Sequence, residues 1–175
     1  MSIISIDIEA DGPCPGLYSM IEIGAVLVQE PLDTTFYGSL KPITERFDLS
    51  ALHSIGRTRE ETLNFNDPKE TIQEFDSWLR EKCKKPYIAI SDNNGFDWSF
   101  VNYYFHLYLS KNPFGYSSRN LNDLFKGIQR DMRASFKGLR KTKHTHNPVM
   151  DAMGNAEALL AMIEKYELKG FEKYM

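Results

Sequence analysis

Five residues along the chain have types that together could bind divalent cations and activate water. They are Asp7, Glu9, Asp97, His146 and Asp151. Converging carboxylates are the ligands that hard cations such as Mg²⁺ and Mn²⁺ prefer, and a titratable side chain beside them can take a proton from water. None of the five is informative alone. As a set, they predict a site that holds two metal ions and hydrolyses phosphodiester bonds.

Asp7 and Glu9 lie two residues apart in the segment IISIDIEADG. Isoleucines alternate with polar residues there, which indicates a β-strand, and side chains two apart on a strand leave the same face. Such a pair can share a cation. The alternative is a solvated acidic face, because an Asp-x-Glu sequence is common by chance. The Gly/Pro-rich turn that follows the strand favours a site at the edge of a sheet.

Asp97 follows a short apolar run, YIAIS, and a polar loop, so it is expected in the first turn of a helix. A carboxylate there also interacts with the helix dipole by about 0.3 to 1 kcal/mol, so a capping role is the alternative. Asp92 competes with Asp97 for the inward position. We prefer Asp97, because Asp92 lies in a loop in which nothing helical would hold it.

His146 and Asp151 are five residues apart, with Pro148 between them. Proline suits the first turn of a helix, so Asp151 is expected about one turn into the last helix and His146 in the loop before it. A loop histidine can act as a general base near neutral pH. The alternative is a surface histidine in a basic loop. His144 has the wrong offset from Asp151 for this role.

The hydrophobic pattern predicts an α/β chain with a strand-rich first third. Three strands follow one another at hairpin distances and should form an antiparallel meander. The helices that follow show apolar residues at helical spacing, and the order of elements points to a mixed sheet flanked by helices. The predicted strands are 4–9, 20–30, 34–42 and 87–91, and the predicted helices are 67–83, 96–109, 120–128 and 149–166.

Length and composition set limits on the kind of protein. The 175 residues suffice for one domain with its own core, so a single domain over 1–175 is expected. The formal net charge of −3 provides no global positive field for a polyanion. Cys14 and Cys83 lie far apart and predict no disulfide framework, and neither a signal peptide nor a membrane span is evident. A cytoplasmic protein that does not enter membranes is expected.

A basic segment leads into the histidine loop. Residues 126–143 contain seven Lys or Arg residues and one acid, Asp131, so they could hold phosphates beside the predicted site. The alternative is a disordered, merely solvated loop. Phe96, Trp98 and Phe100 could stack on bases, although their helical spacing makes core packing the better interpretation for at least two of them.

The chain resembles a known family at the residues discussed above. The series Asp7-x-Glu9, Asp97 at a Phe-Asp helix start, and His146-x4-Asp151 is similar to the DEDDh branch of the 3′-to-5′ exonucleases. That branch includes the proofreading subunit of bacterial DNA polymerase III, oligoribonuclease and ribonuclease T. The segments MIEIGAVLV and MDAMGNAEALLAM also match, so the resemblance spans residues 3–163. One departure is Ala10-Asp11-Gly12, where the family often has a Thr-Gly pair that bears on how the 3′-terminal nucleotide is held.

The resemblance implies a ribonuclease H-like fold with Asp7, Glu9, Asp97 and Asp151 as metal ligands and His146 as the base. It implies two Mg²⁺ or Mn²⁺ ions, a nucleic-acid substrate with a free 3′ end, and nucleoside 5′-monophosphates as products. A homodimer is implied by related stand-alone enzymes. A catalytically silent nucleic-acid-binding module and a structural domain are the alternatives, and the sequence leaves RNA and DNA open as substrates.

Overall fold

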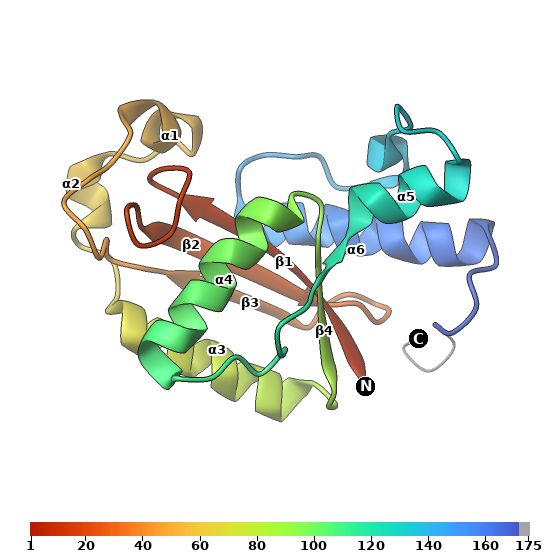
Figure 1. Cartoon of the computed structure of the whole chain (residues 1–175), viewed down its shortest axis with the longest axis horizontal. Coiled ribbons are helices and arrows are strands. Elements are labelled where there is room, and N and C mark those ends of the chain that lie inside the picture. The colour runs from red at the N-terminus through yellow and green to blue at the C-terminus, as the bar shows by residue number, and fades with distance from the viewer. Residues whose placement is uncertain (172–175) are drawn as a thin grey trace.

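The computed structural model describes residues 1–171 and contains a five-stranded mixed sheet in the order β3-β2-β1-β4-β5 (Figure 1). The central strand, β1 (Ser2–Ala10), is buried along its whole length. It pairs antiparallel with β2 and parallel with β4, and β2 pairs antiparallel with β3, so the predicted meander is confirmed. The remaining strands are β2 (Met20–Leu27), β3 (Thr35–Ser39), β4 (Tyr87–Ser91) and β5 (Arg119–Asn120).

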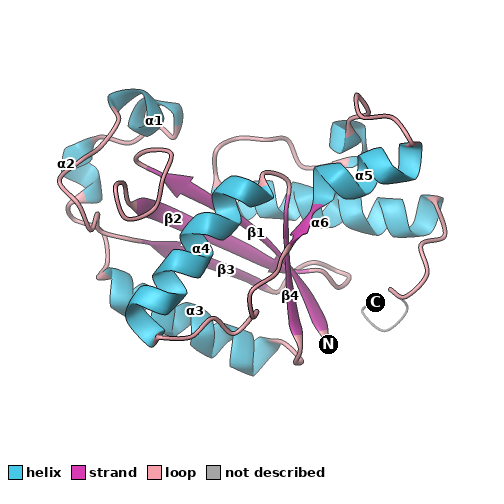
Figure 2. Ribbon diagram, in the orientation of Figure 1, coloured by secondary structure: helices cyan, strands magenta, loops and turns pink. Residues whose placement is uncertain are grey.

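Helices cover both faces of this sheet (Figure 2). On one face, Ile4, Ile6 and Ile8 of β1 pack in a core cluster with α3 (Pro68–Lys82) and α4 (Asn94–Leu109). On the other face, Ile3 packs in a second cluster with α5 (Leu121–Gln129) and α6 (Pro148–Lys165). Because side chains alternate along a strand, Asp7 and Glu9 leave β1 on the face that α6 covers. The predicted mixed sheet flanked by helices is therefore confirmed.

Four short elements were not predicted. They are α1 (Leu49–Ser54), α2 (Arg59–Thr62), β5 and the 3₁₀ helix η1 (Phe136–Leu139). Each is too short to display a hydrophobic period, and the helical ones begin at side-chain caps such as the Thr58–Glu61 capping box. The longer predicted helices differ from the observed ones by one or two residues at their ends, which is the usual scatter of helix boundaries.

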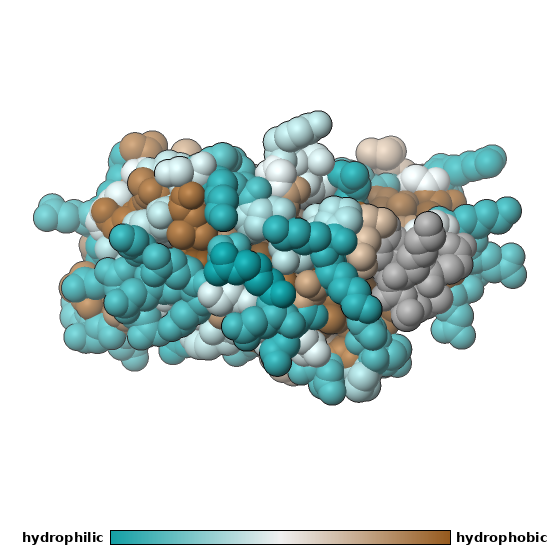
Figure 3. Space-filling model, turned by 90° about the horizontal axis from the view of Figure 1, so that it is seen from below, coloured by the Kyte–Doolittle hydropathy of each residue, from teal (hydrophilic) through white to brown (hydrophobic). Residues whose placement is uncertain are grey.

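Neither a membrane-spanning helix nor a disulfide occurs among the described residues. Seen from the side of α3, the surface is largely hydrophilic, with separate hydrophobic patches (Figure 3). Within residues 1–171, no helix combines the length and the apolar character needed to cross a membrane. Cys14 is exposed and Cys83 is buried, and both are free thiols.

Candidate active site

The first acids of the site are brought together with α6 by a glycine on the neighbouring strand. Asp7 of β1 lies opposite Gly24 of β2. A Cβ atom on Gly24 would lie 2.2 Å from the carbonyl carbon of Pro148, so the first turn of α6 rests directly on the strand backbone at this point. Asp151, one turn further along α6, is thereby placed against β1. One carboxylate oxygen from each of Asp7, Glu9 and Asp151 lies within 4.8 Å of the others.

A second set of carboxylates forms around the start of α4. Oxygens of Asp7, Asp92 and Asp97 also lie within 4.8 Å of one another, so Asp7 belongs to both sets. The backbone N–H of Ile8 donates to Oδ1 of Asp97 at 3.3 Å, while Oδ2 of Asp97 is buried with no partner among the described residues. Asp97 therefore points toward β1. Asp92, the rival in the sequence, lies beside it.

Burial and mutual repulsion change how these acids titrate. Burial, followed by the negative charges of Asp97 and Glu9, raises the pKa of Asp7 well above its usual range. Burial and the charge of Asp151 raise the pKa of Glu9 to about 8. Burial and the charge of Asp92 raise the pKa of Asp97 to about 7. Without a cation, the cluster therefore retains protons near neutral pH, and divalent cations are the natural replacement for them.

These shifts predict that the metal-free protein loses stability as the pH rises. Glu9 and Asp97 ionise near pH 4 in an unfolded chain and near pH 7 to 8 in the folded one, so the folded state binds more protons between these values. The contribution to stability is complete at about pH 4 and is lost as the pH rises to about 8. Thermal unfolding in EDTA from pH 5 to 8 measures it. The Glu9→Gln variant should show a flatter decline, and identical declines in the two proteins would contradict the prediction.

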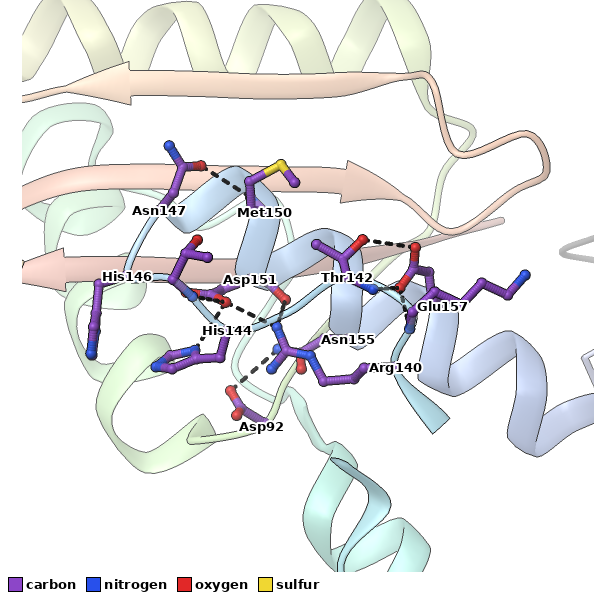
Figure 4. Close-up of polar contacts among 12 residues, drawn as sticks. Asp92, Arg140, Thr142, His144, His146, Asn147, Met150, Asp151, Asn155 and Glu157 are labelled. Carbon is purple, nitrogen blue, oxygen red and sulfur yellow. Dashed lines mark hydrogen bonds and ion pairs between the residues drawn. The ribbon is translucent and has the colours of Figure 1, made fainter. Parts of the chain in front are cut away.

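Two donors and a histidine nitrogen converge on one oxygen of Asp151 (Figure 4). Its Oδ1 accepts from Nη2 of Arg140 at 2.9 Å, from the backbone N–H of Thr145 at 3.2 Å, and lies 2.9 Å from Nδ1 of His144. The side chain of Arg140 is only 7% exposed. A Cβ atom on Gly154 would lie 2.2 Å from Nε of Arg140, so this helical glycine makes room for the guanidinium.

The basic segment is therefore not a disordered loop. The backbone N–H groups of Lys141 and Thr142 donate to Glu157 of α6 at 2.8 and 2.7 Å, which fixes the chain along that helix. Arg140 binds Asp151 and its side chain is buried, so this residue of the basic segment belongs to the carboxylate site rather than to the exposed surface. Its neighbours Lys141 and Lys143 are exposed and stay available to a polyanion.

The two histidines of the loop lie close together, with ring centroids 4.5 Å apart. Nδ1 of His146 lies 3.7 Å from Oε1 of Glu9, which is beyond hydrogen-bonding distance, and the side chain is 47% exposed. Its φ of 56° is left-handed, a conformation that residues other than glycine adopt rarely and often at functional sites. The loop therefore presents the His146 ring at the edge of the carboxylate cluster, while His144 contacts Asp151.

Comparisons with known proteins agree with this geometry. A search against protein-family models finds no match. The chain is 34% identical over 179 residues to the 3′-5′ DNA exonuclease Cap18 of Escherichia coli, which covers 95% of this chain and 93% of that protein. The chain belongs to the DEDDh family of 3′–5′ exonucleases.

Solved structures show the same fold. The nuclease domain of 3′hExo, a DEDDh family member bound to rAMP, matches with a TM-score of 0.75 and 17% identity, covering 94% of this chain and 92% of that one. Pop2p of S. pombe, solved with Mg²⁺ and Mn²⁺ bound, matches with a TM-score of 0.69 and 11% identity, covering 94% and 84%. The ribonuclease H-like fold predicted for this DEDDh exonuclease is thus confirmed.

Two sequence features of this DEDDh exonuclease have structural explanations. Asp11, which departs from the Thr-Gly pair of the family, is fully buried and forms an ion pair with Arg59 at 2.8 Å, so it ties the end of β1 to α2. Phe100 is fully buried, and Phe96 and Trp98 are partly buried against the same core. The packing interpretation of these aromatic residues was therefore the correct one.

The ion pair between Arg140 and Asp151 is expected to stabilise this DEDDh exonuclease when no metal is bound. Arg140→Met keeps the volume over Gly154 but leaves Asp151 without its cation, which should lower the free energy of unfolding by about 3 kcal/mol, or the Tm by roughly 6 to 12 °C. Saturating Mg²⁺ should reduce the loss, because the ion then compensates Asp151. Arg140→Lys, which retains the charge, is the matched control. Equal stability of Arg140→Met and the parent protein in EDTA would refute this role.

Proposed function

We propose that this protein is a metal-dependent 3′–5′ exonuclease that hydrolyses single-stranded nucleic acid from a free 3′ end to nucleoside 5′-monophosphates. The observation that carries the proposal is that Asp7 belongs to two sets of converging carboxylates. A shared carboxylate between two cation sites is what a two-metal phosphodiesterase needs. Residues 1–175 would form a single catalytic domain.

Asp7, Glu9, Asp97 and Asp151 would hold two Mg²⁺ or Mn²⁺ ions. Their oxygens are the hard ligands that these cations prefer, and the unpartnered Oδ2 of Asp97 is an acceptor without a donor in residues 1–171. When bound, such ions polarise the scissile phosphate and make water easier to deprotonate. Oδ1 of Asp151 accepts from Arg140 and Thr145 and lies beside His144. Oδ2 has only the longer bond from the Thr145 N–H, at 3.4 Å, so Oδ2 is the oxygen that Asp151 would offer to a cation.

His146 would act as the general base that takes a proton from the attacking water. The contact between His144 and Asp151 occupies Nδ1 of His144. His146 makes no contact as close as that, so its ring nitrogens remain available, and half of the side chain is exposed to the solvent from which water arrives. His144 would instead help to orient Asp151. The charge of the incoming phosphates would be met by the exposed Lys141 and Lys143.

The site is expected to recognise the sugar-phosphate backbone and the stacked face of a base, so weak sequence preference is part of the proposal. The relative in Escherichia coli is named as a DNA exonuclease, which favours DNA over RNA as the substrate. The two free cysteines favour a cytoplasmic location. A homodimer is proposed on the family resemblance, and the mass of the purified protein in solution tests it.

The decisive experiment is degradation of matched DNA and RNA oligonucleotides of the same sequence, labelled at the 3′-terminal nucleotide. The expected result is release of labelled 5′-mononucleotides from DNA with Mg²⁺ or Mn²⁺, and none with EDTA or with a blocked 3′ end. A silent binding module would retain the strand without releasing nucleotides, and a structural domain would do neither. Either outcome with properly folded protein would overturn the proposed activity.

A further inference from the structure

Asp92 adds a carboxylate to the cluster that the five DEDDh positions do not include. It lies in the loop between β4 and α4, and one of its oxygens lies within 4.8 Å of oxygens of Asp7 and Asp97. Ligand oxygens at about 2.1 Å from an octahedral Mg²⁺ are roughly 3 to 4.2 Å apart. The three oxygens are therefore close to the spacing at which one small cation binds all of them.

The acceptor beside Asp92 gives independent support for a cation at this place. Asp97 is 3% exposed, and its Oδ1 accepts from the backbone N–H of Ile8. Its Oδ2 is buried and receives no hydrogen bond from the described part of the chain. A buried carboxylate oxygen without a donor is unfavourable unless a cation or another ligand compensates it. This oxygen belongs to the residue that shares the second carboxylate set with Asp92.

Asp92 is held rigidly from two helices. Nδ2 of Asn155 in α6 donates to its Oδ1 at 3.2 Å (Figure 4), and Nδ2 of Asn122 in α5 donates to its backbone carbonyl at 3.0 Å. The backbone N–H of Asn93 also donates to Oδ1, at 3.0 Å. These bonds engage Oδ1 and leave Oδ2 for a cation. Asn93 is the N-cap residue of α4, and its side chain makes no capping bond.

We propose that Asp92 is a fifth carboxylate ligand, which completes the second cation site so that this site fills before nucleic acid arrives. This inference rests on the proposed function. Mg²⁺ sites in enzymes of nucleotide chemistry commonly have one or two carboxylates and depend on substrate phosphates for further ligands. With Asp7, Asp92 and Asp97 together, the protein supplies three carboxylates and does not need the phosphate to retain the ion.

Arg140 balances the charge that Asp92 adds. When fully ionised, the five carboxylates carry five negative charges and Arg140 carries one positive charge, which leaves a net charge of −4. Two divalent cations neutralise this charge completely. Arg140 contacts Asp151, which belongs to the other carboxylate set, so it does not occupy the position between Asp92 and Asp97.

The test is calorimetric titration of the whole, nuclease-competent protein with Mn²⁺ in the absence of nucleic acid. The parent protein should bind about two Mn²⁺ per chain, and Asp92→Asn about one, with the affinity of the second site weakened at least about tenfold. Asparagine keeps the shape of the residue and its hydrogen bond from the Asn93 amide, so the variant should fold. Its Tm in EDTA should be at least that of the parent, because a repelling carboxylate has been removed.

Adding deoxyadenosine 5′-monophosphate should restore the second Mn²⁺ to Asp92→Asn, since its phosphate supplies the missing oxygen. Asp33→Asn, in the β2–β3 loop at the opposite end of the strands, is the matched control and should titrate like the parent. Equal binding of two ions by the parent and Asp92→Asn, or one ion in the substrate-free parent, would overturn the role of Asp92 while leaving the exonuclease proposal intact. A parent that binds no Mn²⁺ with or without nucleotide would instead refute the proposed function.

Discussion

Replacing Asp7 with asparagine is expected to abolish nucleotide release, with a loss of at least about 10³-fold. Asp7 contributes an oxygen to both carboxylate sets, so its removal weakens two cation sites at once. Each bound cation supplies several kcal/mol of transition-state stabilisation, and each 1.4 kcal/mol corresponds to a factor of ten in rate. The measurement is single-turnover release of the 3′-terminal nucleotide under saturating Mg²⁺.

The same substitution should leave the fold intact and slightly stabilise the metal-free protein. Asp7 is buried beside several other acids that raise its pKa, so a neutral amide removes repulsion. The Tm of Asp7→Asn in EDTA should therefore equal or exceed that of the parent, and Mg²⁺ should raise it less. Asp33→Asn serves again as the control. Full activity in folded Asp7→Asn would exclude this residue from the metal site.

Replacing His146 with alanine is expected to lower turnover by about 10² to 10⁴, the usual range for loss of a general base. Binding of a single-stranded oligonucleotide in Ca²⁺ should be largely unchanged, because the carboxylates and the exposed lysines remain. His146→Asn tests the imidazole more selectively than His146→Ala does. Asparagine tolerates the left-handed backbone at this position, so the substitution removes only the imidazole.

His144→Ala separates the two histidines of the loop. Nδ1 of His144 lies 2.9 Å from an oxygen of Asp151 that already accepts from Arg140 and Thr145, so the loss of His144 should slow turnover by less than about tenfold. Under saturating Mg²⁺, His144→Ala should therefore stay close to the parent in rate, whereas both variants of His146 should be slow. If His144→Ala lowers turnover more than His146→Ala does, the role of general base belongs to His144.

Stability changes will differ between the acids of the cluster for a reason that was not visible in the sequence. Repulsion among the carboxylates would by itself make removal of any one of them neutral or stabilising. That argument holds for Asp7, but Asp151 is paired with the buried Arg140. Removing Asp151 would leave a buried guanidinium without its partner, so Asp151→Ala should destabilise the protein.

Local patterns in the sequence were sufficient to predict the main elements and the principal acids. The alternation of Ile4, Ile6 and Ile8 with polar residues determines that β1 is a strand and that Asp7 and Glu9 share a face. Pro148 determines where α6 begins, and hence that Asp151 lies one turn inside it. These features depend on the backbone periods of strands and helices, which operate over a few residues and can therefore be read from spacing alone.

Contacts between distant parts of the chain were decided only by the tertiary structure. Asp92 and Asn155 are 63 residues apart in sequence, and Arg140 reaches Asp151 across Gly154 after the chain has turned back along α6. No period connects such residues, because their proximity follows from how α6 packs on Gly24 and how the loop docks on Glu157. The sequence by itself thus determined which acids could bind metal, whereas packing decided that Asp92 joins them and that Arg140 neutralises one of them.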